Sequence, residues 1–193
     1  MIPSFNASMV LPPFIGADPT TRAGMSPYKV TMLQIVERFA ISPDRIAILN
    51  GLISYRAALV AAGIKIGFQW LDGSFVENVE VSRKRPPKDI DIVSIAHRPK
   101  FLDPAQDQQW FNQHSNLFDP DYTSNNFHCD AYFIDLGKRP DLIVDDTRYW
   151  FGLFSHQRET SLWKGMLQVN IDADDTDAML KLNELAQQGA INA

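Results

Sequence analysis

The apolar residues of this chain change their spacing once along the sequence. Between residues 27 and 63 they recur at helical intervals, which predicts two helices, over 27–40 and from Ser42 to about Gly63. Ser42 and Pro43 favour the start of the second helix, and Gly63 favours its end. Beyond it, four segments follow a two-residue period and are predicted strands: 65–73, 89–96, 128–136 and 164–171.

The remaining segments complete a mixed architecture. A polar, aromatic stretch predicts a helix over 104–118, and an amphipathic stretch predicts another over 174–188, with core contacts from Met179, Leu182 and Leu185 or their neighbours. Residues 1–26 are rich in Pro, Gly, Ser and Thr and predict an extended arm laid over the protein. We expect an α+β fold, with a small mixed sheet flanked by helices in a single domain, 27–193.

Composition narrows the class of protein. The 193 residues suit one domain, and the net charge of -5 argues against a protein that coats nucleic acid by bulk electrostatics, although a local basic patch can still engage it. The single cysteine, Cys129, excludes an internal disulfide and a cysteine-rich zinc site, and is best taken as a small buried residue of a cytoplasmic protein. No apolar stretch reaches the roughly 18 residues that span a bilayer, so no membrane insertion is expected.

Two carboxylates carry the first candidate chemistry. Asp89 and Asp91 lie one residue apart at the start of an apolar strand, so both are expected to point the same way and to repel each other. A hard divalent cation, Mg²⁺ or Mn²⁺, relieves such repulsion and leaves coordination positions for water and substrate phosphates. The pair therefore predicts a metal site for a phosphate-bearing substrate.

Two further features fit the same site. Gly73 and Ser74 follow a predicted strand, where main-chain N–H groups and the Ser74 hydroxyl can hold a phosphate. Asp130 begins a later apolar run and is expected to bring a third carboxylate to the metal; its rival Asp135 is predicted on the opposite face of that strand. Asp72 is taken as a turn former.

Basic and aromatic residues supply weaker candidates. Lys88, in a basic linker with Arg83, Lys84 and Arg85, can clamp phosphates or an RNA acceptor, although such runs are usually solvated. Lys164 is a second candidate phosphate contact. Aromatic residues at 110–111, 149–151 and 154 can stack on a base, but such clusters usually form core. The four histidines show no metal-ligand spacing.

The ordered set of Gly73-Ser74, Asp89-Ile90-Asp91 and Asp130 resembles the signature of the DNA polymerase beta-type nucleotidyltransferase superfamily. The segments "LPPF", "WLDGSFVE", "PKDIDIV" and "CDAYFI" are similar to a group of uncharacterised bacterial nucleotidyltransferase-like proteins. The 14-residue linker between Ser74 and Asp89 is longer than in compact members of the superfamily.

This resemblance implies transfer of a nucleoside monophosphate from an NTP to a hydroxyl of a nucleic acid, small molecule or protein, with release of pyrophosphate. It implies that Asp89 and Asp91 hold the metal on the triphosphate, and that Asp130 completes a second metal site or takes the hydroxyl proton.

Other functions compete with this interpretation. An Asp-x-Asp pair also occurs at the metal site of sugar-nucleotide glycosyltransferases, which need neither the Gly-Ser turn nor the third acidic strand. An aspartyl-phosphate phosphatase is excluded because Val93 stands where Thr or Ser is required. The non-enzymatic alternative is a degenerate nucleotide-binding subunit or antitoxin, acting in a bacterial defence or toxin-antitoxin system through a protein partner from a neighbouring gene.

Overall fold

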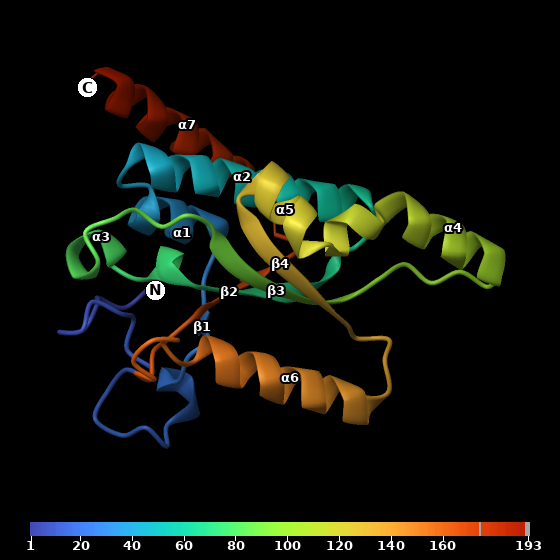
Figure 1. Cartoon of the computed structure of the whole chain (residues 1–193), viewed down its shortest axis with the longest axis horizontal. Helices are drawn as coiled ribbons and strands as arrows, with labels where there is room; N and C mark the ends of the chain where they lie inside the picture. Colours follow the sequence, from blue (N-terminus) through green and yellow to red (C-terminus); the bar gives the residue numbers. More distant parts are fainter. Residues whose placement is uncertain (174, 192–193) are drawn as a thin grey trace.

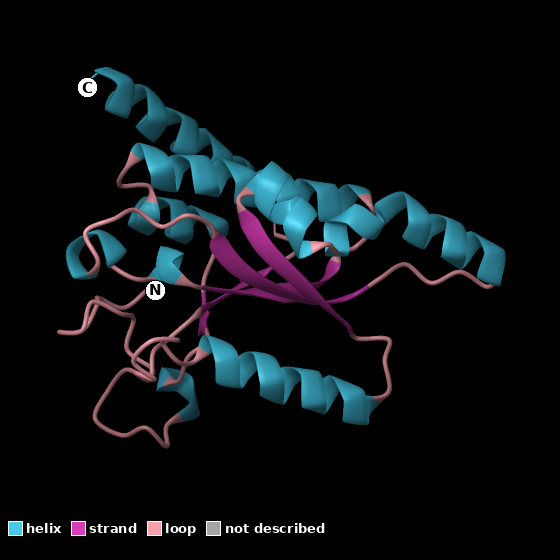
Figure 2. Cartoon of the chain, viewed as in Figure 1, coloured by secondary structure: helices cyan, strands magenta, loops and turns pink. Residues whose placement is uncertain are grey.

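The computed structural model describes residues 1–173 and 175–191, and it places a five-stranded mixed sheet between two helical layers (Figures 1 and 2). The strands are β1 (Tyr28–Lys29), β2 (Ile66–Asp72), β3 (Ile90–His97), β4 (Cys129–Asp135) and β5 (Leu167–Asn170). Their order in the sheet is β1-β5-β2-β3-β4. β2 runs antiparallel to β3 and β5, while β3 pairs with β4, and β1 with β5, in parallel. The mixed sheet flanked by helices that the sequence predicts is thus confirmed.

The helices cover the two faces of the sheet unequally. The helices are α1 (Met32–Phe39), α2 (Pro43–Ala61), α3 (Val79–Ser82), α4 (Pro104–His114), α5 (Pro120–Phe127), α6 (Pro140–Phe154) and α7 (Thr176–Ile191), with 3₁₀ turns at Arg22–Gly24, Ser74–Val76 and Ser115–Phe118. In Figure 1, α1, α2, α5 and α7 lie above the sheet and α6 lies below it. None of the helices within 1–173 and 175–191 is long and apolar enough to cross a membrane.

Alternation along the strands divides the apolar residues into two cores. In β3, Ile92 faces the larger core, between the sheet and helices α1, α2 and α7. Val93 faces the smaller core, between the sheet and α6. The smaller core joins Val93 to Phe154 of α6 and Met166. Both faces of the sheet are therefore covered, and the open surface of the central strands lies at their ends.

Local signals explain where most elements begin. The Ser42 hydroxyl accepts a hydrogen bond from Arg45 N at the start of α2, and Gly63 follows that helix with φ +89°. The helix predicted over 27–40 is wrong in its first turn. Tyr28 and Val30 instead bond through their main chains to the β5 region, and α1 begins after a Thr31 capping box.

The structure refines three other expectations. Met179 is 44% exposed, and the predicted core contacts of α7 come from Leu182, its neighbour Ala178 and the partly buried Leu185. The helix predicted over 104–118 changes to a 3₁₀ turn after His114, and α5 and α6 were not expected from the sequence. Among the arm residues, Val10 and Leu11 are fully buried, so this part of the arm packs as core.

Candidate active site

An acidic row crosses three adjacent strands at one end of the sheet. The register pairs Asp72 of β2 with Asp91 of β3, and Asp91 with Asp130 of β4. Side chains of directly paired residues share a face, and neighbouring strands lie about 4.8 Å apart. Asp89 stands one residue before β3, so strand alternation does not fix its direction. Asp72, interpreted from sequence as a turn former, is instead the buried last residue of β2.

The acidic row borders a cleft of about 700 Å³. Of the residues predicted for the site, Gly73, Ser74, Asp89, Asp91, Asp130 and Lys164 line this cleft. Lys88 does not line it and is exposed on the preceding loop. Asp135 lies at the other end of β4, where its carboxylate binds Arg98 at 3.0 Å.

The glycine-serine turn packs directly against the acidic row. Gly73 has φ +79°, and a Cβ built on it would meet Asp91 Oδ2 at 2.6 Å. Glycine is therefore required here by backbone conformation and by space. Ser74 opens the 3₁₀ turn, and in the described part of the chain no hydrogen bond uses its hydroxyl or its main-chain N–H. Two donors at the edge of the cleft are thus available to a ligand.

Arg45 of α2 holds the segment that follows this turn. Its guanidinium is 1% exposed, and it donates to the main-chain oxygens of Phe75 at 2.6 Å and Glu77 at 2.7 Å. It also forms a two-point ion pair with Glu80 of α3. The 14-residue linker is consequently ordered at its beginning, and its greater length does not separate Ser74 from the acidic row.

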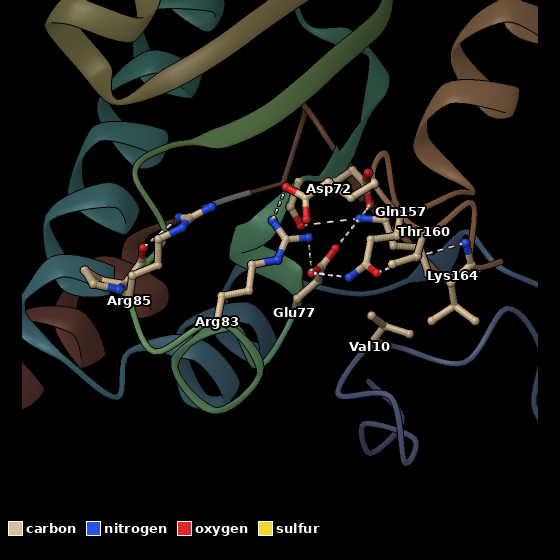
Figure 3. Close-up of polar contacts among 12 residues, drawn as sticks. Val10, Asp72, Glu77, Arg83, Arg85, Gln157, Thr160 and Lys164 are labelled. Atoms are coloured by element: carbon tan, nitrogen blue, oxygen red, sulfur yellow. Dashed lines mark hydrogen bonds and ion pairs between the residues drawn. The ribbon is translucent and has the colours of Figure 1, made fainter.

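Lys164 holds the turn from inside. Its ammonium lies 3.0 Å from Oδ1 of Asp72, before the turn, and 3.1 Å from Oε1 of Glu77, after the turn. It also lies 3.4 Å from the main-chain oxygen of Gly73, within the turn (Figure 3). Burial alone would lower the pKa of Lys164, but the carboxylates of Asp72 and Glu77 outweigh burial and raise it. An ammonium has three N–H donors. Lys164 donates hydrogen bonds to Glu77 Oε1 and Gly73 O, and its contact with Asp72 is an ion pair. Because Lys164 is buried, the phosphate contact predicted for it would require one of these partners to be exchanged.

Glu77 joins this turn to the segment after α6. Gln157 Nε2 donates to Glu77 Oε2 at 2.9 Å, and Arg83 approaches the same oxygen at 3.5 Å (Figure 3). The main chain of Glu77 also bridges to Val10 of the arm. These contacts make the wall of the cleft from segments that are far apart in sequence.

Burial and mutual repulsion govern the charges of the acidic row. Burial, followed by the charges of Asp72, Asp89 and Asp130, raises the pKa of Asp91 to about 7. Burial also raises the pKa of Asp72 to about 6, against the opposing effect of Lys164. The pKa of Asp130 is raised by its partial burial and by Asp89. Ionising the row therefore costs free energy that a nearby cation would recover.

The donor chemistry of the row fits a hard divalent cation only in part. Asp89, Asp91 and Asp130 supply carboxylate oxygens, the ligand type that Mg²⁺ and Mn²⁺ prefer. No group of three or more His, Cys, Asp or Glu side chains within the described residues is arranged to hold a metal ion. Asp89 stands outside β3, so the three-carboxylate centre expected from the sequence stays a prediction. Mg²⁺ commonly uses one or two carboxylates and takes its other ligands from water and phosphates.

Cations and aromatic rings also line the cleft. Arg83 and Arg85 of the basic linker are among them, together with Arg158, which belongs to no sequence motif. Tyr149 is 56% exposed on α6 and packs edge-on against Trp150. The predicted aromatic cluster thus divides, with Phe154 in the smaller core and Tyr149 largely in solvent.

The fold and site together define a mixed α/β protein with an acidic cleft at one end of its sheet. The chain belongs to a family of unknown function, DUF6932, whose model matches residues 3–170. No curated protein and no solved structure matches the chain.

We expect Gly73→Ala to lower the unfolding free energy by about 1–3 kcal/mol, because alanine is strained at φ +79° and its methyl group would displace the Asp91 carboxylate. In an Asp91→Ala background the cost should fall by about 0.5 kcal/mol or more, measured as the coupling energy of a double-mutant cycle in urea. Gly152→Ala is the control, since nothing lies within 4 Å of a Cβ there. If Gly73→Ala lowered the unfolding free energy equally in the parent and in Asp91→Ala, the close contact between position 73 and the Asp91 carboxylate would be contradicted.

Without divalent cations, the protein should lose stability as pH rises from about 4 to about 8. The pKa values of Asp91, about 7, and Asp72, about 6, exceed the ordinary value of 3.8, so the folded state binds more protons than the unfolded state across this window. Asp91→Asn should therefore be more stable than the parent at pH 8, by about 1–3 kcal/mol, with a gain that shrinks toward pH 4.

Urea unfolding in EDTA at several pH values measures this difference. Asp141→Asn, at an exposed position on α6, is the control and should follow the parent. The account fails if Asp91→Asn and the parent show the same pH dependence.

Proposed function

We propose that this protein is a metal-dependent nucleotidyltransferase that moves a nucleoside monophosphate from an NTP to an acceptor hydroxyl. The observation that carries the proposal is the register pairing of Asp91 with Asp130, in a cleft where the Gly73-Ser74 turn packs against the Asp91 carboxylate. Acidic oxygens and unused phosphate donors are thereby neighbours. That combination suits a substrate with both a triphosphate and its counter-ion.

The triphosphate is bound at the Gly73-Ser74 side of the cleft. The Ser74 hydroxyl and main-chain N–H donate to phosphate oxygens, because neither has another acceptor among the described residues. Arg83 and Arg158 line the same cleft and add positive charge. The partners of Arg83, Glu77 at 3.5 Å and Glu159 at 3.9 Å, are distant enough to be exchanged for phosphate.

Asp89, Asp91 and Asp130 are the residues that would hold the divalent cation. Bound Mg²⁺ or Mn²⁺ supplies charge neutralisation at the α-phosphate and a lower pKa for the acceptor hydroxyl. Lys164 keeps Asp72 paired, so the carboxylates left for a cation are those of these three aspartates.

Asp130 is the group placed to receive the acceptor's proton. It lies on β4, an edge strand, and its partial burial raises its pKa, which makes it a stronger base than an ordinary carboxylate. As the proton moves to an Asp130 oxygen, the acceptor oxygen bonds to the α-phosphorus in line with the departing pyrophosphate, whose bond to phosphorus breaks. Tyr149 offers an exposed ring on which the base of the NTP stacks.

A non-catalytic role is the second candidate, and one observation favours it. No three-carboxylate metal group is present in the part of the chain that the structure describes. A nucleotide-binding subunit or antitoxin, which retains the cleft but acts through a protein partner, requires only the phosphate side of the site. The acceptor, and a cytoplasmic setting in bacterial defence, belong to the proposal on the strength of the sequence resemblance alone.

Label transfer from NTPs tests the enzymatic proposal. The full chain is incubated with each α-³²P-labelled NTP, Mg²⁺ or Mn²⁺, and total RNA or protein extract as acceptor. We expect labelled product from the parent and a loss of about a hundredfold or more in Asp91→Asn and Asp130→Asn, because each removes a carboxylate of the reacting centre. Asp141→Asn should retain activity, since Asp141 lies at an exposed position on α6. Equal transfer by parent and Asp91→Asn would refute catalysis, whereas NTP binding without transfer would favour the second candidate.

A further inference from the structure

A second cavity, of about 670 Å³, lies along the outer edge of the sheet. β4 is the last strand in the sheet order, so one of its edges has no neighbouring strand. Tyr132 and Phe133 both line the cavity although they point to opposite faces of β4. A cavity bordered by both faces must run along the edge itself.

The main chain of β4 offers unpaired hydrogen-bonding groups to this cavity. Ile90 N bonds to His128 O and Leu136 N bonds to Ala96 O, which sets the even-numbered residues of β4 toward β3. The N–H and C=O of Phe133 therefore point away from the sheet, and no hydrogen bond among the described residues uses them. Ala131 is fully buried, whereas Phe133 and Asp135 are only partly covered. The accessible edge thus begins at Phe133.

Aromatic side chains form the walls of the cavity. On one side, Phe111 of α4 stacks on Phe118 with ring centroids 6.1 Å apart and an interplanar angle of 2°. Phe111 is 45% exposed. On the other side, Trp150 of α6 packs against Tyr132 at 4.4 Å between centroids. The walls can therefore receive apolar or aromatic side chains that project from whatever lies along the edge.

The charges around the cavity argue against a polyanionic ligand. Arg98 is paired with Asp107 at 2.9 Å and with Asp135 at 3.0 Å. Lys138 is paired with Asp146 at 2.7 Å. Both cations that line the cavity already have carboxylate partners, so neither is available to a phosphate backbone without breaking an ion pair. A largely uncharged, extended chain fits this surface better.

We propose that the outer edge of β4 binds an extended polypeptide segment of a partner protein as an added strand. Main-chain hydrogen bonds form to the N–H and C=O of Phe133 and to the N–H of Asp135, whose C=O already accepts from Lys138 N. Alternate apolar side chains of the segment pack between Phe111 and Trp150. Tyr132 and Trp150 also line the acidic cleft, so the bound segment lies beside that cleft. This docking site does not depend on nucleotidyl transfer.

Selection from a library of random peptides of roughly ten residues, displayed on phage and presented to the full chain, tests the proposal. We expect enrichment of sequences in which apolar or aromatic residues alternate with polar ones. Fluorescence anisotropy of the synthetic peptides should show binding about tenfold weaker to Phe111→Ser than to the parent. Leu142→Ser is the matched control, because Leu142 is 46% exposed on α6 and does not line the cavity, and it should bind like the parent.

N-methylation of the peptide distinguishes strand addition from binding through side chains alone. Methylating every second amide on the edge that faces β4 should abolish binding, whereas methylating the intervening amides should leave it intact.

Asp91→Asn should bind the peptides like the parent, so a failed transferase assay leaves this result interpretable. The proposal is overturned if no alternating peptide is enriched, if N-methylation in both registers has the same effect, or if single-stranded RNA, but no peptide, binds in a Phe111-dependent way. It is also overturned if the edge is occupied by a second copy of the chain in a stable dimer.

Discussion

The parallel pairing of β3 with β4 imposes the central constraint on this molecule, because it sets the carboxylates of Asp91 and Asp130 on the same face of adjacent strands. The pairing of β2 with β3 adds Asp72 to the same row. Three carboxylates in neighbouring registers repel one another, and the raised pKa values of Asp72, Asp91 and Asp130 express the cost of their ionisation. A protein that keeps such a row at the end of its sheet retains an arrangement that destabilises its own folded state.

The surrounding structure pairs one end of the acidic row with a cation and leaves the other end without an ion pair. Lys164 is buried against Asp72 and Glu77, and Arg45 fixes the main chain that follows Ser74. The arm contributes to the same wall through Val10, which explains why an apolar segment so early in the chain is fully buried. Asp91 and Asp130 form no ion pair among the described residues, and they lie next to the turn with unused donors. The geometry thus separates a structural half of the row from a half available to a ligand.

Sequence periodicity and local signals predicted the framework well where the elements are long or sharply capped. The two-residue period located β2, β3 and β4, and Ser42 with Pro43 located the start of α2. β1 was not predicted because two residues are too few to show a period, and its pairing with β5 overrides the helical pattern around it. α6 was not predicted from the sequence, although Pro140 at its first turn was an available signal for a helix start.

The candidate site was predictable where chemistry and sequence proximity coincide. Acidic residues beside apolar runs predicted that Asp91 and Asp130 would meet once their strands paired. The roles of Lys164 and Asp72 depend on contacts between residues about ninety positions apart, and neither carries a local signal of burial. Lys88 was predicted from its charge alone, and an exposed loop accommodates such a residue without directing it into the cleft.

Anomalous diffraction from crystals of the protein soaked with Mn²⁺ and a non-hydrolysable NTP analogue tests the central claim most directly. The account predicts a manganese peak contacting the carboxylates of Asp91 and Asp130, with the triphosphate at the Gly73-Ser74 turn. A metal and triphosphate bound elsewhere, or an acidic row without manganese at a saturating concentration, would contradict it.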